Sequence, residues 1–555
     1  MFLNTKRNKA SNVQPEHKSK KRIFYGNRHT NETEVSFAST SAKKLKNKDD
    51  FEITIDAMNG YRIIHFMFVF NILKTLLKCK KCDSDVHFYV RGEQGLGFKI
   101  IVDCDCDLTE IDSCPKINNK SFEINRRMVF AMRLIGVGLQ GINTFCGLMD
   151  LGQGLATNVY YACLENIWTA SKAVFDTVIL KAASEEKEKN TEAENESLGL
   201  TVSGDVTWSK RGYSSLFEVV TLIGKYSDKI VDLIVKSTFC QACNDWQKKN
   251  DEEFEAWYGG HKKHCVSNHT GSAGKMDGVI EMFARSETLH EVKYINYIGD
   301  TKTFKALLDS KPYGDELPIT KEEYFGHVKK RMDFRLRAAK RNNKRLCGNG
   351  PGKLTDALIN DLSTYYSMAI IHNSDSVDAM KDAIWATFYH KCSTDENPQH
   401  DKCPPGESSW CKWKQAEANN VLEYEHPAPL TLQVQEVIRS IYEDLSSDDL
   451  LKRYVDGYTQ NNECFNSLIW SFAPKHIFCT RKTIEIASFL AACIFNEGFN
   501  SVLRIMEAMG IKIGMNASIM ATREDNKRRR NADKRALQAS SICPSVGDCN
   551  KKRAE

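Results

Sequence analysis

The stretch TVSGDVTWSKRG, residues 201–212, combines a candidate catalytic acid with groups that suit phosphate. An apolar–polar alternation typical of a β-strand runs into Asp205, and the cations Lys210 and Arg211 follow. A carboxylate is a hard oxygen ligand of the kind that Mg²⁺ and Mn²⁺ prefer. Lys and Arg can contact phosphate groups without reading the base sequence. The stretch therefore indicates metal-assisted chemistry on a phosphodiester.

Two further carboxylates stand where they could join Asp205. The strand pattern VKYINYIGD ends on Asp300, and the helix pattern NNECFNSLIWSFAP carries Glu463. Because strand ends bring side chains to one edge of a sheet, we expect Asp205 and Asp300 to meet there. Three such ligands would hold divalent metals that activate a water or a 3′-hydroxyl and stabilise the leaving oxygen.

Cysteines and histidines recur at spacings typical of zinc sites. The chain has nineteen cysteines and no apparent secretory signal, which indicates a reducing compartment in which paired Cys more often bind metal. A first set flanks the β-like stretch GFKIIVDC and predicts a zinc ribbon, with ordinary buried cysteines as the alternative: Cys79, Cys82, Cys104 and Cys106.

Two more sets lie further along the chain. The second predicts a structural zinc site, because four closed ligands leave no position for substrate: Cys240, Cys243, His261, Cys265 and His269, with His264 as a spare. The third either binds metal or belongs to a loop held by the packing of Trp410 and Trp413: His390, Cys392, His400, Cys403 and Cys411.

The elements that must position these groups predict an α/β fold. The segments GLTVSGDVTW, SSLFEVVTLIG and KIVDLIVKSTFC are rich in β-branched residues and predict an antiparallel meander of three strands. A helix, the strand ending on Asp300 and another helix follow, and residues 353–455 have mostly helical periodicity.

The N-terminal part divides into smaller predicted units. Residues 51–120 form the zinc-ribbon-like module, whose apolar stretch 63–77 is too short to span a bilayer and predicts a buried element. Residues 121–183 are helical and fit a helix-turn-helix with Ala156–Leu164 as the recognition helix, although generic helix packing gives the same pattern. Residues 184–198 are a charged linker or exposed helix that marks a domain boundary.

The charge is concentrated at the chain ends. The net charge is only +5, but residues 1–50 hold twelve Lys and Arg against five acids, and residues 523–555 hold ten against five. The pattern predicts a disordered basic tail at 1–50 and a basic C-terminal tail at 516–555. KSKKR (18–22), KKLKNK (43–48) and KRRRNADKR (527–535) suit nuclear import or phosphate binding, and solvated disordered tails are the alternative. In the body, KKRMDFRLRAAKRNNKRL (329–346) is the densest basic helix.

Seven segments resemble, in order, the blocks of the Mutator-like transposase domain, a DDE-type family: SGDVTWSKRGYSSL, FCQACNDW, CVSNHTGSAGKM, YINYIGDTKTFKAL, GHVKKRM, STDENPQHDKCP and NECFNSLIW. The resemblance covers roughly residues 60–515. It implies a ribonuclease H-like mixed sheet at 199–515 with a helical insertion at about 328–455, and Mg²⁺ or Mn²⁺ held by Asp205, Asp300 and Glu463.

The resemblance also implies partners. These are transposon ends and target DNA, a homo-oligomeric assembly, no membrane and a nuclear location. The expected DNA contacts are Lys210, Arg211, His327, Lys329, Lys330 and Arg331, whereas Trp208 and Tyr213 are expected to pack on the sheet.

Two departures from the family pattern keep other functions open. The family's Gly-Asp-Gly-Asp block is reduced to Asp300 followed by Thr301, and its Cys-x2-His element is replaced by Tyr324-x2-His327. A transposase-derived DNA-binding protein without catalysis and a nuclease on the same fold are therefore the alternatives.

Overall fold

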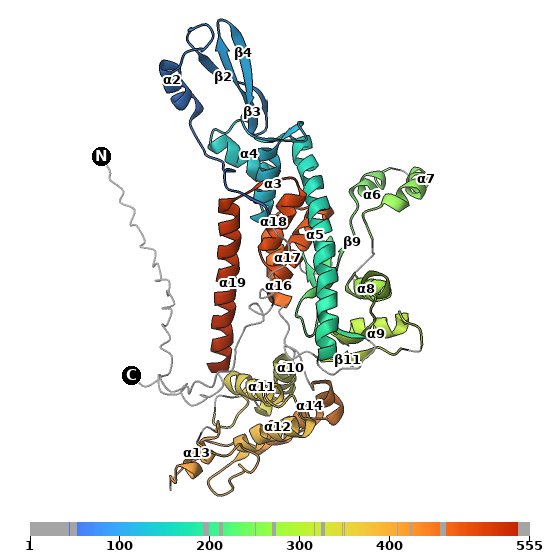
Figure 1. Cartoon of the computed structure of the whole chain (residues 1–555). Helices are drawn as coiled ribbons and strands as arrows, with labels where there is room; N and C mark the ends of the chain where they lie inside the picture. Colours follow the sequence, from blue (N-terminus) through green and yellow to red (C-terminus); the bar gives the residue numbers. More distant parts are fainter. Residues whose placement is uncertain are drawn as a thin grey trace, which may run out of the picture.

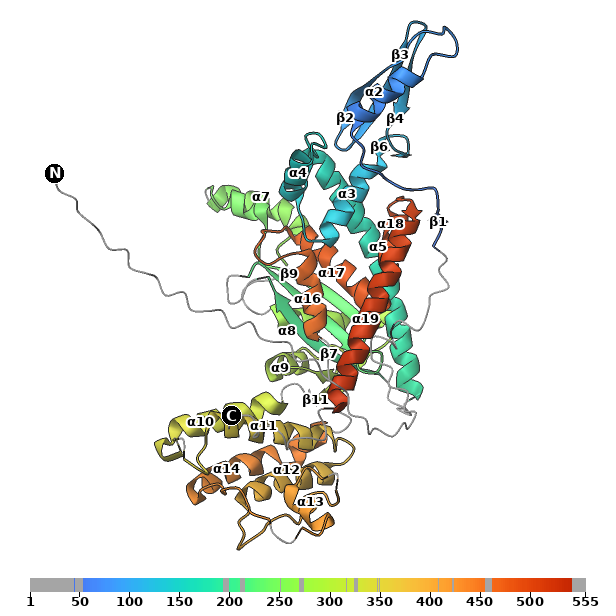
Figure 2. The same cartoon turned by 90° about the vertical axis from the view of Figure 1, so that its left-hand side faces the viewer.

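The computed structural model describes residues 53–541 and Lys44, with gaps at 193–198, 210–214, 250, 269–273, 316, 324–327, 347, 349, 408, 422–423 and 455–461. Apart from Lys44, the N-terminal tail and its two basic runs lie outside these residues, as does the end of the C-terminal tail. Figures 1 and 2 show an elongated molecule, with a small β-module and a helical unit at opposite ends of a central α/β body.

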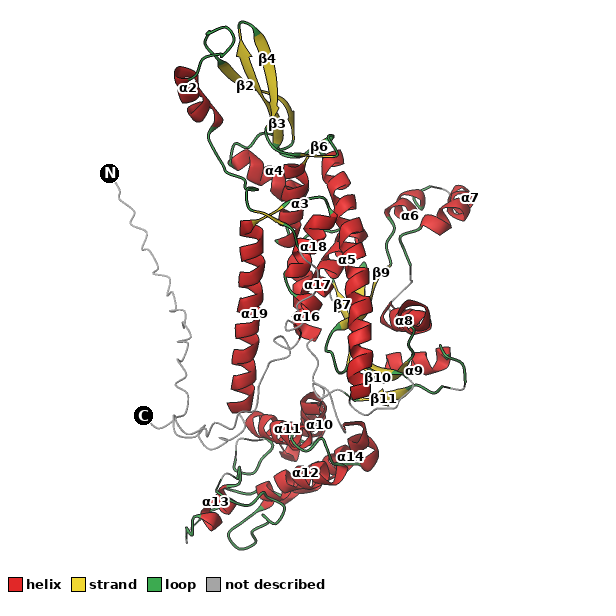
Figure 3. Cartoon of the chain, in the orientation of Figure 1, coloured by secondary structure: helices red, strands yellow, loops and turns green. Residues whose placement is uncertain are grey.

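The body is built on a five-stranded mixed sheet with the order β11–β10–β7–β8–β9. The strands are β7 (Leu200–Trp208), β8 (Phe217–Gly224), β9 (Ile230–Ser237), β10 (Tyr294–Ile298) and β11 (Thr320–Glu322). The first three form an antiparallel meander, as the sequence predicts. β10 lies parallel to β7, and β11 lies parallel to β10 (Figure 3).

Helices cover both faces of this sheet, which explains why β8 and β9 are buried along their whole length. On one face, residues such as Val219 and Leu233 share a core with α5 (Thr157–Glu192), α17 (Arg481–Glu497) and α18 (Asn500–Ala508). On the other, alternate residues such as Val220 and Ile234 pack with α8 (Gly274–His290) and α9 (Thr301–Ser310). The alternation of side chains along a strand thus feeds two cores.

The helical segment before the sheet is organised differently from the sequence prediction. Helices α3 (Glu123–Leu134) and α4 (Leu139–Leu148) precede α5, and the proposed recognition segment at 156–164 forms the start of this 36-residue helix. Tyr160, Cys163 and Leu164 are buried there, so the segment is not a separate exposed helix.

Of the two alternatives for 184–198, a linker or an exposed helix, residues 184–192 form a helix that continues α5, but it is not exposed throughout. Glu186 is fully buried and accepts hydrogen bonds from the backbone N–H groups of Tyr226 (2.9 Å) and Ser227 (2.6 Å) in the β8–β9 turn. The segment is charged, but Glu186 and Asn190 are four residues apart and therefore lie on the same, buried side of the helix. The predicted boundary therefore falls inside a helix that covers the sheet.

The N-terminal module consists of α2 (Phe66–Leu76) and the antiparallel strands β2 (His87–Gln94), β3 (Gly97–Cys104) and β4 (Asp107–Asp112). The prediction of a buried element at 63–77 is wrong, because no α2 residue is buried. Only one side of α2 packs, through aromatic contacts such as Phe70 with Phe88, whose ring centroids are 5.1 Å apart. A lone three-stranded sheet offers too little surface to cover such a helix.

Most of the segment 328–455 forms a helical unit with its own hydrophobic core. It contains α10 (Val328–Asn342), α11 (Asp356–Ile371), α12 (Val377–Cys392) and α14 (Leu432–Leu445), with the short α13 (Lys412–Ala418) and α15 (Asp448–Leu451). The unit lies beyond the β11 edge of the sheet (Figure 2).

The C-terminal segment is folded further than the sequence predicts. Strand β12 (Ile513–Gly514) pairs in parallel with β1 (Ile55–Asp56), and α19 (Met515–Ser541) follows, so the tail predicted from 516 is a helix up to 541. Arg528, within the basic run, donates to the carbonyl of Phe495 (2.7 Å) and to that of Ile494 at the end of α17. Arg528 therefore stabilises the contact between α19 and the last turn of α17.

Among the described residues, no single helix is both long and apolar enough to cross a membrane. Helices α3 and α4 together have sufficient length and apolar composition, but they are bent by 112° relative to each other.

Candidate active site and metal centres

Asp205 and Asp300 lie just beyond the end of the β7–β10 pairing, Asp205 within β7 and Asp300 two residues after the parallel strand β10. In the β7–β10 register Ser203 pairs with Ile298, and each aspartate stands two residues further along its chain. Adjacent strands are about 4.8 Å apart, so the two positions are neighbours. Burial, together with the charges of Asp300 and Asp205, raises the pKa of Tyr297.

Helix α16 (Asn462–Phe472) lies alongside β7 and holds its polar side chains. The Asn466 amide donates to Asp205 Oδ2 at 2.9 Å, and the Trp470 indole N–H donates to Thr207 Oγ1 at 2.7 Å. Glu463 lies on this helix, one turn before Asn466, and its side chain lies outside what the structure describes. The open depression beside Asp205 is lined by Thr207, Asn466, Ser467, Trp470, Ser471 and Lys475.

Asp300 has a structural role as the N-cap of α9. Its Oδ1 accepts the backbone N–H of Thr303, and its Oδ2 accepts the Thr303 hydroxyl, both at 2.9 Å. These bonds fix the orientation of the carboxylate at the end of the strand. An ionised carboxylate has about four lone-pair sites, so both oxygens retain the capacity to bind a cation.

The predicted DNA contacts divide into two groups. Lys210, Arg211 and His327 lie outside the described residues, as does Tyr213. Lys329 and Lys330 are exposed on α10, in contrast to Arg331, which is engaged by the protein.

Arg331 donates to the carboxylate of the buried Glu323 (3.0 Å) and to the Tyr454 hydroxyl (2.9 Å). Glu323 also accepts from Lys321 at 2.7 Å. Arg331 therefore links the insertion to the sheet edge. Trp208, expected to pack on the sheet, is the last residue of β7 and is 42% exposed.

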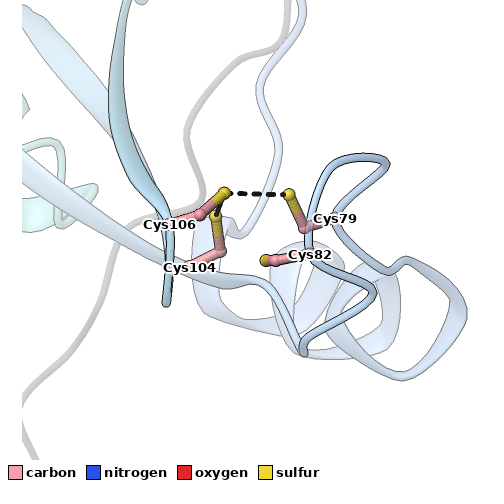
Figure 4. Close-up of side chains that lie close together, drawn as sticks. All are labelled: Cys79, Cys82, Cys104 and Cys106. Atoms are coloured by element: carbon pink, nitrogen blue, oxygen red, sulfur yellow. Dashed lines mark hydrogen bonds between the residues drawn. The ribbon is translucent and has the colours of Figure 1, made fainter.

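The first cysteine set converges as predicted (Figure 4). Cys79 and Cys82 follow α2, whereas Cys104 and Cys106 lie at the β3–β4 turn, and their four Sγ atoms lie within 4.8 Å of one another. The Sγ of Cys106 is 3.6 Å from that of Cys79 and 3.5 Å from that of Cys104. Backbone N–H groups of Cys82 and Lys81 lower the pKa of Cys79 to about 6, which favours the metal-binding thiolate.

The second set converges where the chain leaves β9. Cys240, Cys243, His261 and Cys265 offer ligand atoms within 4.8 Å of one another, close to α6 (Gln241–Trp246) and α7 (Asp251–His261). Cys240 Sγ lies 3.3 Å from His261 Nε2. Burial raises the pKa of Cys240, but hydrogen bonds from backbone N–H groups outweigh it and bring the value to about 6. His264 is not one of these four residues, and His269 lies outside the described residues.

The third set also converges, in the insertion, with one correction. His390, His400, Cys403 and Cys411 form a group, but Cys392 does not belong to it. Cys392 packs in the core of the insertion, where burial raises the pKa of its thiol to about 11.

Sequence reasoning missed the residues that support the carboxylates. Asn466 and Trp470 follow Glu463 at spacings of three and seven, which is one face of a helix, so the periodicity of NECFNSLIW carried a signal. No comparable signal marked Asp232, which is fully buried on β9 and pairs with Arg285 of α8.

Comparison with known proteins supports one family. The model of the Mutator-like transposase family matches residues 60–411, more than half of the chain. The match includes Asp205, Asp300 and all three Cys/His groups, and it ends before α16 and Glu463. No curated protein and no solved structure matches the chain. With this match over the sheet, the carboxylate edge and most of the insertion, the chain belongs to the Mutator-like transposase family.

Proposed function

We propose that the protein is a DDE-type transposase that binds the DNA ends of a mobile element, cleaves them and transfers the strands to a target. The observation that carries the proposal is the parallel register of β7 and β10, which places Asp205 and Asp300 two residues beyond the pair Ser203–Ile298, with Asp205 bonded to Asn466 of α16. A meander of three antiparallel strands with two parallel strands beyond the first is the strand order of a ribonuclease H-like core, and it supports the assignment of that fold.

Two carboxylates at a sheet edge suit Mg²⁺ or Mn²⁺, and Glu463 is the third ligand implied by the family resemblance. Such ions, when bound, activate the attacking oxygen and stabilise the leaving oxygen of a phosphodiester. The chain itself orients the ligands: Asn466 holds Asp205, and Thr303 holds Asp300. The depression beside α16 is lined by Asn466, the residue that donates to Asp205.

The first two Cys/His groups suit structural Zn²⁺. Tetrahedral zinc with ordinary bond lengths separates two thiolates by about 3.8 Å and a thiolate from an imidazole nitrogen by about 3.6 Å. The observed distances of 3.3–3.6 Å agree with this geometry. A zinc ion with four protein ligands has no open position for substrate and stabilises the fold. In the N-terminal module, which has a small hydrophobic core, zinc would supply part of the stability.

DNA is the proposed partner of the insertion as well. The exposed Lys329 and Lys330 on α10 would contact phosphates, and the basic termini suit the same role. A DNA substrate in turn favours a nuclear location and a multimeric assembly that holds two element ends.

A DNA-binding protein without catalysis is the second candidate. It is favoured by the shortened block around Asp300, where Thr301 follows directly and Thr303 engages both carboxylate oxygens. A carboxylate retained only as a helix cap would keep the fold and lose the metal.

Cleavage of DNA carrying the element's terminal inverted repeats tests the proposal. We expect Mn²⁺-dependent cleavage by the wild type and none by Asp205→Ala or Glu463→Ala, with all proteins binding the DNA in a mobility-shift assay. Asp309→Ala, at an exposed position of α9, is the matched control and should cleave normally. If the wild type binds but cleaves no more than Asp205→Ala, catalysis is refuted and the second candidate stands.

A further inference from the structure

The insertion contains a group of four side chains that lies far from the carboxylate edge. His390 is on α12, and His400, Cys403 and Cys411 belong to the segment that connects α12 to α14. The three residues of the connecting segment are buried, and His390 is half-buried. Their ligand atoms lie within 4.8 Å of one another, with the two imidazoles both presenting Nδ1.

The separations within this group are those of a metal tetrahedron. Cys411 Sγ lies 3.4 Å from His400 Nδ1 and 3.6 Å from His390 Nδ1, and the two nitrogens are 3.2 Å apart. Tetrahedral Zn²⁺ with ordinary bonds would set the sulfur–nitrogen separation at about 3.6 Å and the nitrogen–nitrogen separation at about 3.3 Å. Two thiolates and two imidazoles are a donor set that suits this ion.

The opposite side of His400 carries a chain of polar contacts. Its Nε2 lies 3.0 Å from Nε2 of His426, and His426 Nδ1 lies 2.6 Å from the carboxylate of Asp395. With a metal at Nδ1, His400 keeps its proton on Nε2 and donates it to His426, which in turn donates from Nδ1 to Asp395. One tautomer of each ring satisfies the whole chain, as in the carboxylate–histidine arrangements behind zinc ligands.

Ring packing completes the support of the ligand. The Trp413 ring stacks on His400 with centroids 5.5 Å apart and an interplanar angle of 14°. His426 is almost fully buried, since only 3% of its side chain is exposed. The sequence left two alternatives open for this loop, metal binding or stabilisation by tryptophan packing. Because Trp413 packs against the candidate metal ligand His400, the loop has both features.

The connecting segment needs such an anchor. Between α12 and α14 the structure describes one helix, the seven-residue α13. Short helices have little stability of their own, so the fold of this segment depends on tertiary contacts. Four bonds to one ion would fasten it to the end of α12.

We propose that His390, His400, Cys403 and Cys411 form a structural zinc site that fastens the connecting segment to α12, with His426 and Asp395 as positioning residues. The site is separate from the carboxylate edge and does not depend on whether the protein cleaves DNA.

Metal analysis of the purified full-length protein tests the site. Cys411→Ser and His390→Ala should each contain one zinc equivalent fewer than the wild type. Cys392→Ala is the matched control, because Cys392 is two residues from His390 on α12 and points into the core, and its zinc content should be unchanged. An undiminished zinc content in both ligand variants overturns the proposal.

Cobalt substitution keeps the test valid if a ligand variant does not fold. The three groups have four, three and two cysteines, and the visible bands of Co²⁺ depend on the number of thiolates, so wild-type protein loaded with Co²⁺ should show a two-thiolate component. A spectrum without that component refutes the site.

The positioning residues have their own readout. His426→Gln and Asp395→Asn should retain the zinc equivalent at saturation and lose it to a competing chelator at a concentration about 10–100-fold lower than the wild type requires. Equal resistance to the chelator in both variants would show that the polar chain does not support the ligand.

Discussion

The pair formed by Asp232 and Arg285 offers a quantitative test of how β9 is held to α8. Asp232 is fully buried, and its carboxylate accepts from Arg285 Nε at 3.0 Å, from Arg285 Nη2, and from the backbone N–H of Leu233 at 2.7 Å. The Arg285 side chain is 37% exposed. Burial raises the pKa of Asp232 despite the opposing effect of the guanidinium.

The substitution Arg285→Met keeps a linear apolar stem and removes the guanidinium with its charge. Removing one partner of a buried ion pair costs about 3–5 kcal/mol, and we take about 3 kcal/mol because Arg285 reaches solvent. The double substitution Asp232→Leu with Arg285→Met leaves no unpaired charge and should recover most of this loss.

The loss should also depend on pH. A carboxyl group whose folded-state pKa is raised contributes stability that is fully present below its unfolded pKa and is lost as pH rises through the folded value. Without Arg285 the pKa of Asp232 rises further, so the deficit of Arg285→Met should be largest at neutral pH and should shrink as the solution is acidified.

Hydrogen exchange of β8 and β9 amides measures this free energy locally, which suits a chain of several units. A deficit below about 1 kcal/mol at neutral pH, a deficit that does not shrink with acid, or a double variant no more stable than Arg285→Met would each refute the reasoning.

The remaining predictions concern three other sites. Glu186→Gln should lower the stability of the β8–β9 turn by about 2 kcal/mol, because the carboxylate accepts hydrogen bonds from two backbone N–H groups. Hydrogen-exchange protection of the turn amides measures this loss, and Glu188→Gln, at an exposed position, should not change it. Burial lowers the pKa of His290 to about 4, so acidification protonates this histidine in the unfolded chain before it does so in the folded one. The free energy of unfolding should therefore fall by up to about 3 kcal/mol as the pH is lowered from 6.5 to 4, and this fall should be absent in His290→Phe. Asn466→Ala should weaken Mn²⁺ binding about tenfold in calorimetry, because Asp205 loses the donor that orients it; unchanged affinity would contradict that role.

Local sequence patterns were sufficient for the features that depend on near neighbours. The β-branched runs predict the strands of the meander because alternate residues of a buried strand face two cores, as Val219 and Val220 do. The Cys-x2-Cys spacings of Cys79 with Cys82 and of Cys240 with Cys243 identified candidate ligands, because two cysteines three positions apart can lie on one turn of the chain. The mostly helical character of residues 353–455 followed from their periodicity, whereas the insertion itself was implied by the family resemblance.

Composition misled where burial depends on the rest of the fold. The charged segment after residue 184 continues α5, because the β8–β9 turn offers N–H groups to Glu186. The apolar stretch at α2 stays exposed, because the small module has no second layer to cover it. Neither outcome is encoded in the local pattern.

The sequence by itself therefore determined the strands, most helices, the candidate acids and the pools of metal ligands. Only the tertiary structure decided which of these groups meet. The parallel pairing of β10 with β7 brings the positions of Asp205 and Asp300 together, and the return of the chain after α12 brings His400, Cys403 and Cys411 to His390. The physical reason is that register and loop closure depend on contacts between residues far apart in the chain, whereas residue type and spacing report only on neighbours.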